Sequence, residues 1–254
     1  MNLVEIIKYF ETKYPKELAY EWDNVGIQVG TLNIVANKVL VTLDVTKEVI
    51  KEAIDKKVNL IISHHPLLFN PLDKIIFDTP RGWMIKNLIK HNITVYSAHT
   101  NYDLAEGGMN DEFAKILKLQ NVGLLDEVDG IGRYGDIEAI DTLTFIKNIK
   151  TSLNVETVKI IGRTDRMITR VGISGGSGSK HMYQAKMRGC DIYLTGDVTY
   201  HTALDAQALG ITLLDIGHHA EKIFVAAVAR DLKKQFPEIE FIKSEIDTNP
   251  YQNI

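Results

Sequence analysis

A repeated order of short apolar runs and amphipathic helices constrains the fold more than any other feature. One run starts at Lys38-Val39-Leu40-Val41 and another at Arg170-Val171-Gly172-Ile173, and each opens a predicted strand–helix–strand unit. The units end an equal number of residues on, at Ser63-His64-His65 and at Thr195-Gly196-Asp197, and both continue into a helix and a strand. Strands that alternate with helices form parallel sheets. The repeat therefore predicts an α/β fold class with two pseudo-symmetric αβ lobes, whose mainly parallel sheets face a central cleft.

The 254 residues are enough for two lobes with a sizeable core. We predict an N-terminal lobe over residues 1–125, to which the C-terminal segment contributes, and a C-terminal lobe over residues 126–254. The two are expected to form a single intertwined unit. Residues 121–140 are rich in Gly and Asp and show no strong period, so no element is assigned there.

Composition excludes several classes of protein. The formal net charge of −4 argues against a non-specific nucleic-acid binder, which needs a basic face. A single cysteine, Cys190, can form neither an intramolecular disulfide nor a thiolate zinc cluster. The first residues lack the apolar core of a signal peptide, and no apolar run approaches the ~20 residues of a membrane span. We therefore expect a cytoplasmic protein that does not interact with membranes.

Histidines and carboxylates follow the predicted strands. His64 and His65 directly follow the apolar run Asn59–Ile62, and Pro66 closes the segment. In an α/β sheet, ligands bind beyond the carboxyl ends of the strands. Three further sets follow other strands or open a helix, and the predicted topology brings all of them to the cleft: His99 with Asp103, Gly196 with Asp197, and His218 with Glu221.

This combination of donors suits metal ions. Imidazole and carboxylate ligands without thiolates are typical of zinc, iron, manganese or cobalt sites. A carboxylate such as Asp103 can bridge two cations, which together activate water. Other interpretations stay open: His64 and His65 in a plain surface loop, Asp103 as a helix cap, Glu221 as a helix-dipole partner, and His99 as a hydrogen-bonding neighbour of the ligands.

A glycine-rich segment, Gly175-Gly176-Ser177-Gly178-Ser179, precedes another predicted helix. It could hold a phosphate through backbone N–H groups or form a plain tight turn. It lacks the lysine and threonine that end a P-loop, which argues against a nucleoside triphosphatase of that kind.

Several segments in order resemble the NIF-three-like dinuclear metal-centre family, also known as GTP cyclohydrolase I type 2 homologues. They are WDNVGIQVG, ISHHPLLF, SAHTNYD, GGMND, GISGGSGS, LTGDVTYH and DIGHHAEK. The resemblance runs from about Leu3 to Ile246. It corresponds to the short form of the family, because the stretch from Asp126 to Ile140 leaves no room for the domain that some members insert.

The resemblance implies a central metal cleft with two divalent metal ions per chain and a ring-shaped hexamer. It also implies that His64 and His65 bind different metals, that Asp103 is shared, and that His99 transfers a proton or holds substrate. In the family, a histidine and a glutamate from the final helix complete the ligand set, and here the candidates are His218 or His219 with Glu221. Some members place them four residues apart, whereas Glu221 follows His218 by three residues and His219 by two. We assign His218, because residues two apart on a helix point in nearly opposite directions.

The activity implied by the resemblance is hydrolytic opening of the imidazole ring of GTP. Two alternatives stay open. One is metal-dependent hydrolysis of phosphoesters in small molecules. The other is a non-enzymatic regulatory or scaffold ring that binds other proteins or DNA, although the acidic charge argues against DNA.

Overall fold

The computed structural model of the protein describes residues 1–252 and contains two compact units. Unit 1 consists of Met1–Ala105 and Phe224–Asn249, and unit 2 of Glu106–Ile223 with the residues from Pro250 on. The C-terminal segment thus contributes to unit 1. The division after Ala105 lies earlier than the predicted boundary after residue 125, because helix α5 (Met109–Ile116) and strand β5 (Gln120–Leu124) contact strand β6 (Arg133–Asp141) of unit 2.

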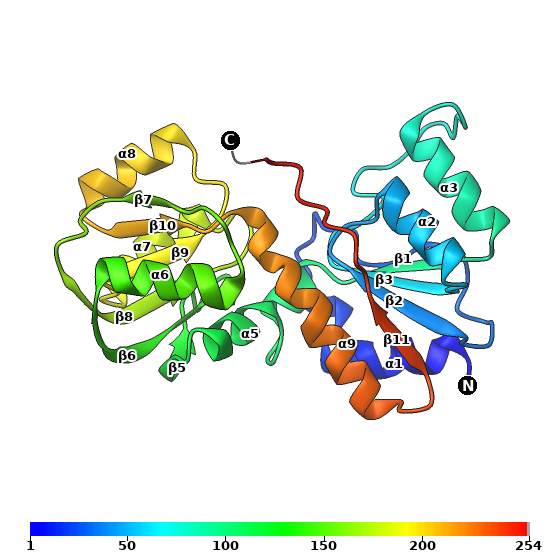
Figure 1. The fold of residues 1–254 in the computed structure, drawn as a ribbon, viewed down its shortest axis with the longest axis horizontal. Coiled ribbons are helices and arrows are strands. Elements are labelled where there is room, and N and C mark those ends of the chain that lie inside the picture. Colours follow the sequence, from blue (N-terminus) through cyan, green and yellow to red (C-terminus); the bar gives the residue numbers. More distant parts are fainter. Residues whose placement is uncertain (253–254) are drawn as a thin grey trace. The chain divides into compact units, whose positions relative to one another are not determined.

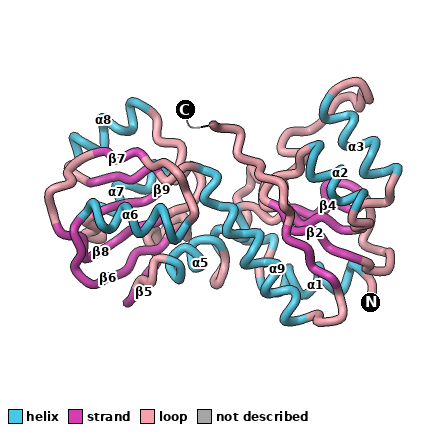
Figure 2. The backbone as a smooth tube through the Cα atoms, in the orientation of Figure 1, coloured by secondary structure: helices cyan, strands magenta, loops and turns pink. Residues whose placement is uncertain are grey.

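Unit 1 is built on a five-stranded sheet of order β1-β4-β3-β2-β11. Its strands are β1 (Gly26–Val29), β2 (Lys38–Thr42), β3 (Leu60–Ser63), β4 (Thr94–Ser97) and β11 (Glu240–Lys243). Its helical segments are α1 (Leu3–Lys13), η1 (Lys16–Leu18), α2 (Lys47–Asp55), α3 (Pro80–Lys90), α4 (Thr100–Leu104) and most of α9 (Ile223–Gln235). The connection from β3 to α3 is an extended loop without regular structure (Figure 2).

Parallel pairing prevails in this sheet. Strands β11, β2, β3 and β4 run parallel, and only the edge strand β1 is antiparallel to its neighbour β4. The register aligns Thr42 with Ser63 and Ser63 with Ser97, so that β2, β3 and β4 end level with one another. The residues that follow these strands therefore emerge side by side at one edge of the sheet.

Helices cover both faces of the sheet (Figure 1). Helix α1 packs on one face through the buried side chains of Leu3, Ile6, Ile7 and Phe10. The ring of Phe10 contacts that of Tyr96 on β4. Helices α2 and α3 cover the other face. Both begin at a capping threonine, because the side chains of Thr46 and Thr79 accept hydrogen bonds from the N–H groups of Val49 and Gly82.

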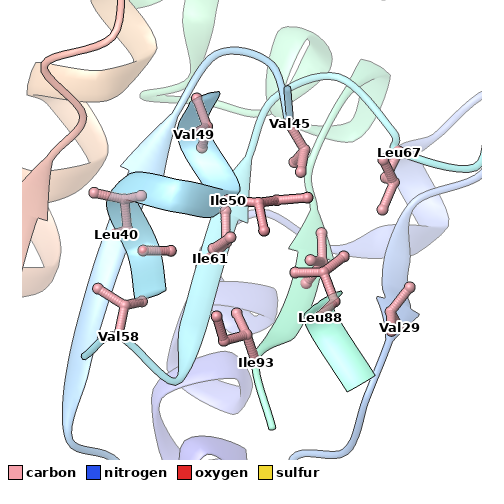
Figure 3. Close-up of a cluster of buried hydrophobic side chains, with 12 residues drawn as sticks. Val29, Leu40, Val45, Val49, Ile50, Val58, Ile61, Leu67, Leu88 and Ile93 are labelled. Atoms are coloured by element: carbon pink, nitrogen blue, oxygen red, sulfur yellow. The ribbon is translucent and has the colours of Figure 1, made fainter. Parts of the chain in front are cut away.

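A buried apolar cluster joins α2 and α3 to the strands (Figure 3). Ile61 of β3 and Leu40 of β2 contribute from the sheet, Ile50 from α2 and Leu88 from α3. Valines complete the packing around them, among them Val49 and Val58. This cluster fixes β3, and with it the two histidines that follow.

Unit 2 is built on a six-stranded sheet of order β5-β6-β8-β9-β10-β7. The further strands are β7 (Lys159–Ile161), β8 (Met167–Ile173), β9 (Ile192–Thr195) and β10 (Thr212–Asp215). The further helical segments are α6 (Thr142–Leu153), η2 (Ser179–His181), α7 (Met182–Met187), α8 (Tyr200–Leu209) and η3 (His218–Lys222).

The two units repeat the same order of strands and helices, as predicted. Strands β2, β3 and β4 are linked through α2 and α3, as β8, β9 and β10 are through α7 and α8. In unit 2 the expectation of a mainly parallel sheet needs correction. Only β8–β9 and β9–β10 are parallel, whereas β5–β6, β6–β8 and β10–β7 are antiparallel. The antiparallel half comes mostly from β5 and β6, which lie in the Gly- and Asp-rich segment where no strand was expected.

A buried polar pair closes the loop after β5. The Asp126 carboxylate accepts hydrogen bonds from the N–H groups of Val128 and Asp129 and pairs with His181 Nδ1 at 3.0 Å. Burial lowers the pKa of His181, against the opposing effect of Asp126. No helix among residues 1–252 is both long and apolar enough to cross a membrane.

Truncation of Ile61 should destabilise unit 1. The side chain is fully buried between strands and helices, so Ile61→Ala removes apolar contacts and leaves a cavity. We expect a loss of about 2–5 kcal/mol in the free energy of unfolding, measured by urea denaturation. The exposed Ile89 on α3 provides the matched control, and Ile89→Ala should change stability by less than about 0.5 kcal/mol. Equal effects of both substitutions would contradict this account of the core.

Candidate metal centre

Three histidines stand at the level ends of β3 and β4 in unit 1. His64 and His65 directly follow β3, and His99 lies two residues beyond the end of β4 and directly before α4. The imidazole ring of His64 lies 4.9 Å from that of His65 and 5.2 Å from that of His99, between ring centroids. The parallel register of the strands thus gathers three imidazoles at one edge of the sheet.

His64 is the most buried of the three. Its Nδ1 donates a hydrogen bond to the Ala98 carbonyl at 2.8 Å, just past the end of β4. Its Nε2 lies 3.6 Å from Oδ1 of Asp103, which α4 presents. The histidine and the predicted shared carboxylate are therefore neighbours within unit 1.

His65 is held by a carboxylate from the neighbouring strand end. Its Nδ1 lies 2.6 Å from Oδ1 of Asp44, two residues beyond the end of β2. Thr248 donates a second hydrogen bond to the same carboxylate. Burial would raise the pKa of Asp44, but the hydrogen bond from His65 and that from Thr248 outweigh it and lower the pKa. Asp44 therefore stays ionised and accepts from His65.

His99 is held in the same way by Asp23, in the loop before β1. Nδ1 of His99 lies 2.9 Å from Oδ1 of Asp23, and Oδ2 accepts from both the N–H and the hydroxyl of Thr100. Burial would raise the pKa of Asp23, but these hydrogen bonds lower it to about 2. The carboxylate is therefore a fixed acceptor at the start of α4.

These contacts fix the tautomer of all three rings. Because each Nδ1 faces a carbonyl or an ionised carboxylate, Nδ1 carries the proton, and a neutral ring keeps the lone pair on Nε2. Ligand atoms from His64, His65 and His99 lie within 4.8 Å of one another. Metal-binding histidines commonly have this arrangement, with the second ring nitrogen bonded to a carboxylate or carbonyl. The donor set fits a nitrogen- and oxygen-ligated divalent ion such as zinc, iron, manganese or cobalt.

In unit 2, an aspartate orients His218 in the same way. Nδ1 of His218 lies 2.6 Å from Oδ2 of Asp197, and Nε2 lies 3.2 Å from Oε2 of Glu221. Burial would raise the pKa of Asp197, but hydrogen bonds from Ser177 and His218 lower it. Asp197 follows β9, and its positive φ of 53° is uncommon for a residue with a side chain. Such backbone conformations concentrate at functional sites.

The segment that holds His218 and Glu221 differs from the expected α-helix. Residues His218–Lys222 form the 3₁₀-helix η3, and the α-helix α9 begins only at Ile223. Because residues three apart eclipse in a 3₁₀-helix, His218 and Glu221 lie one above the other. Glu221 is only 2% exposed, and its carboxylate lies within reach of the His218 ring.

The glycine-rich segment packs against this pair. A Cβ atom on Gly176 would lie 2.6 Å from Oε1 of Glu221 and 3.5 Å from Nε2 of His218. A Cβ atom on Gly175 would lie 3.0 Å from the same carboxylate oxygen. The N–H groups of Gly175 and Gly178 donate to the side chains of Asn110 and Thr195. The glycines thus allow the backbone to approach Glu221 closely.

The structure describes the predicted site residues in two groups. His64, His65, His99 and Asp103 cluster in unit 1, and His218 and Glu221 pair in unit 2. Sequence reasoning missed the acceptors that orient the histidines, which are Asp23, Asp44 and Asp197. The sequence placed Asp197 after a strand but gave it no such role, and for Asp44 the available signal was its position just after the predicted strand that starts at Lys38. Asp23 lies in a loop distant in sequence from His99.

Within residues 1–252, unit 2 also holds a separate group of metal-binding residue types. It consists of Asp126, Asp129 and His181. Asp126 already accepts backbone and histidine hydrogen bonds, and Asp129 forms an ion pair with Lys180. These contacts show that the three residues hold the loop after β5 closed.

Comparison with known proteins gives the same family as the sequence motifs do. The family described as Duf34/NIF3 (NGG1p interacting factor 3) matches residues 1–250. Two curated proteins named "GTP cyclohydrolase 1 type 2 homolog" match along their whole length and along all of this chain. The one from Clostridium perfringens is 38% identical over 262 aligned residues, and the one from Lactococcus lactis is 36% identical over 257. A crystal structure of a Bacillus cereus protein related to NIF3 superimposes with a TM-score of 0.96 at 29% identity, covering 100% of this chain and 99% of that one.

A side chain at Gly176 should disturb the Glu221 contact. Gly176 has a φ of +56°, so Gly176→Ala combines backbone strain with a close contact at Glu221. Gly189→Ala is the matched control, because Gly189 has a φ of +72° and nothing within 4 Å of its Cβ position. Both should pay the left-handed penalty, about 1–2 kcal/mol, and Gly176→Ala should lose about 1–3 kcal/mol more. Thermal unfolding would measure the difference, and equal losses would show that the contact does not matter.

Proposed function

Because the chain belongs to the Duf34/NIF3 family, and relatives along its whole length carry the name GTP cyclohydrolase 1 type 2 homolog, we propose that it is a metal-dependent hydrolase. The proposed reaction is hydrolytic opening of the imidazole ring of GTP. The proposal is supported most directly by the three imidazoles of unit 1, whose Nδ1 atoms are all engaged by protein acceptors and whose ligand atoms lie within 4.8 Å of one another. This arrangement prepares nitrogen lone pairs for a cation before any cation arrives.

The proposed metal ligands are the residues that the family resemblance implies. We assign His64, His65 and Asp103 from unit 1 and His218 and Glu221 from unit 2 to two divalent ions, drawn from zinc, iron, manganese or cobalt. Bound ions would supply Lewis acidity for activating water and stabilising negative charge. The neighbouring carboxylates Asp44 and Asp197 hold the imidazole rings of His65 and His218 in the orientation that binding requires.

His99 is proposed as the group that transfers the proton. Water attack on C8 of the purine ring releases a proton, and departure of a ring nitrogen requires one. Asp23 holds His99 with the proton on Nδ1, so Nε2 can accept a proton and the carboxylate stabilises the resulting imidazolium. Asp23 is a positioning residue in this scheme, because it acts through His99.

The proposal predicts metal-dependent consumption of GTP. Protein loaded with divalent metal should bind two ions per chain and convert GTP with release of formate once the ring opens fully. His65→Ala should lose at least one ion and most of the turnover, because it removes a nitrogen ligand. Elemental analysis of metal content and chromatography of the nucleotide products would measure both.

His91 supplies the matched control for that substitution. It is an exposed histidine at the end of α3, where Nδ1 bonds to the carbonyl of Asn87. His91→Ala should retain metal and turnover. A protein that carries two ions but leaves GTP intact would refute the proposed reaction, and cleavage of a phosphoester panel by the same sample would favour the alternative hydrolase. A loaded protein inert to both would favour a regulatory or scaffold role.

The orienting carboxylate should affect metal affinity without being a ligand. Asp44→Asn keeps an oxygen acceptor for His65 but removes the negative charge, so the imidazole becomes a weaker donor to a cation. We expect metal affinity to fall about 10- to 100-fold, measured by competition with a chromophoric chelator. Asp73→Asn, on the exposed loop between β3 and α3, removes the same charge away from the histidines and should leave affinity unchanged. Equal affinities for all three proteins would contradict the role of Asp44.

A further inference from the structure

Three aromatic side chains lie together beside His99 in unit 1, and two of them are exposed. Trp22 is 59% exposed and Phe69 is 46% exposed. The indole ring of Trp22 stacks on the ring of Tyr20 at a centroid distance of 5.5 Å and an interplanar angle of 28°. The ring of Phe69 lies 6.0 Å from that of Trp22. Tyr20, Trp22 and Phe69 together are called the aromatic platform below.

The platform joins two loops that hydrogen bonds lock together. Asn24 donates from Nδ2 to the Leu68 carbonyl at 2.5 Å, and the Leu68 N–H donates to Oε1 of Gln28 at 3.0 Å. Gln28 in turn donates to the carbonyl of Asn24. The loop that carries Trp22 and the loop that carries Phe69 are therefore held in register before any ligand binds. A surface of this kind loses little conformational entropy on binding.

The platform is also fixed to the histidine cluster. Trp22 immediately precedes Asp23, whose carboxylate holds His99 and Thr100, and the N–H of Tyr20 donates to the hydroxyl of Thr100. The ring of His99 lies 6.1 Å from that of Trp22 and 6.3 Å from that of Phe69, nearly perpendicular to both. A flat ring stacked on the platform would thus meet the imidazole of His99 at its edge.

Exposed aromatic rings held rigidly beside polar groups are typical of binding surfaces. The rings of the platform are uncharged and offer π-faces, while the neighbouring His99 offers hydrogen bonding. This combination suits a planar ring with nitrogen atoms at its edge better than an aliphatic chain or an ion. Stacking of bases on aromatic side chains is a recurrent means of binding nucleotides.

We propose that Tyr20, Trp22 and Phe69 stack against the heteroaromatic ring of the substrate and present its edge to His99. The substrate class is a compound with a planar heteroaromatic base, a purine in the first instance. The identity of the reacting base rests on the proposed function, whereas stacking on the platform is testable without turnover.

Fluorescence of Trp22 provides that test. The chain has two tryptophans, Trp22 and Trp83, so Trp83→Phe leaves Trp22 as the only one. Trp83 is partly buried against the core cluster, where phenylalanine keeps an aromatic ring. Guanosine and GTP should quench Trp22 emission saturably, with excitation near 295 nm and free N-acetyltryptophanamide titrated in parallel as the control for absorption. Ribose 5-phosphate, which lacks a base, should not.

Kinetics and matched variants complete the experiment. In the otherwise unchanged protein, Trp22→Ala and Phe69→Ala should weaken guanosine binding about 5- to 100-fold by calorimetry and, where GTP is turned over, raise KM in the same proportion. Tyr200→Ala removes a still more exposed aromatic ring from α8 in unit 2 and should leave binding unchanged. Circular dichroism of each variant would establish that the fold is retained.

The possible outcomes distinguish the stacking proposal from the proposed hydrolysis of GTP. Saturable quenching without GTP turnover would support the platform and refute the proposed reaction. GTP turnover with unchanged KM in Trp22→Ala would refute the platform and leave the reaction standing. If no purine or pterin quenches Trp22, and Trp22→Ala instead changes the oligomeric state in sedimentation, the face is a protein interface and the stacking proposal is wrong.

Discussion

The candidate centre depends on hydrogen bonds that fix the Nδ1 side of its histidines. The acceptors are the Ala98 carbonyl for His64, Asp44 for His65, Asp23 for His99 and Asp197 for His218. An imidazole without such a partner exchanges between two tautomers and turns about its side-chain bonds. With Nδ1–H engaged, the other nitrogen presents its lone pair in one direction, which a cation or a proton can use at once. The low pKa values of the three carboxylates keep these acceptors ionised.

The parallel sheet explains why acceptors are within reach of the histidines. In unit 1, strands β2, β3 and β4 end at the same level, so Asp44, His65 and Ala98 emerge from neighbouring strands. In unit 2, β9 and β10 pair in parallel, and Asp197 and His218 follow their ends. Each orienting contact thus joins groups that are close because the strands are paired, although they are distant in sequence. Packing of α2 and α3 on β3 adds the rigidity that such contacts require.

The sequence was informative where local chemistry and periodicity decide the structure. The strand–helix alternation, the caps at Thr46 and Thr79, and the placement of His64 and His65 after a buried strand all follow from short-range patterns. The sequence was uninformative where contacts between distant segments decide the structure. Strands β5 and β6 have little apolar alternation and form because they pair antiparallel with each other and with β8. The contact between Asp23 and His99 joins residues 76 positions apart, which no local pattern encodes.

The 3₁₀-helix η3 could not be predicted from the sequence for a related reason. Periodicity does not separate the first turn of an α-helix from a 3₁₀ turn, yet the difference decides which side chains meet. In η3, His218 lies directly over Glu221, and glycines at 175 and 176 give the buried carboxylate its space. The glycine-rich segment, for which the sequence left open a phosphate-binding loop or a plain tight turn, packs closely against the side chain of Glu221.

Asp23 connects substrate recognition with proton transfer in the proposed scheme. Its carboxylate holds the His99 ring, and its backbone directly continues from Trp22 in the aromatic platform. The loop that places Trp22 therefore also orients the imidazole of His99. A single buried carboxylate, fully ionised at neutral pH, thus sets the geometry for both steps.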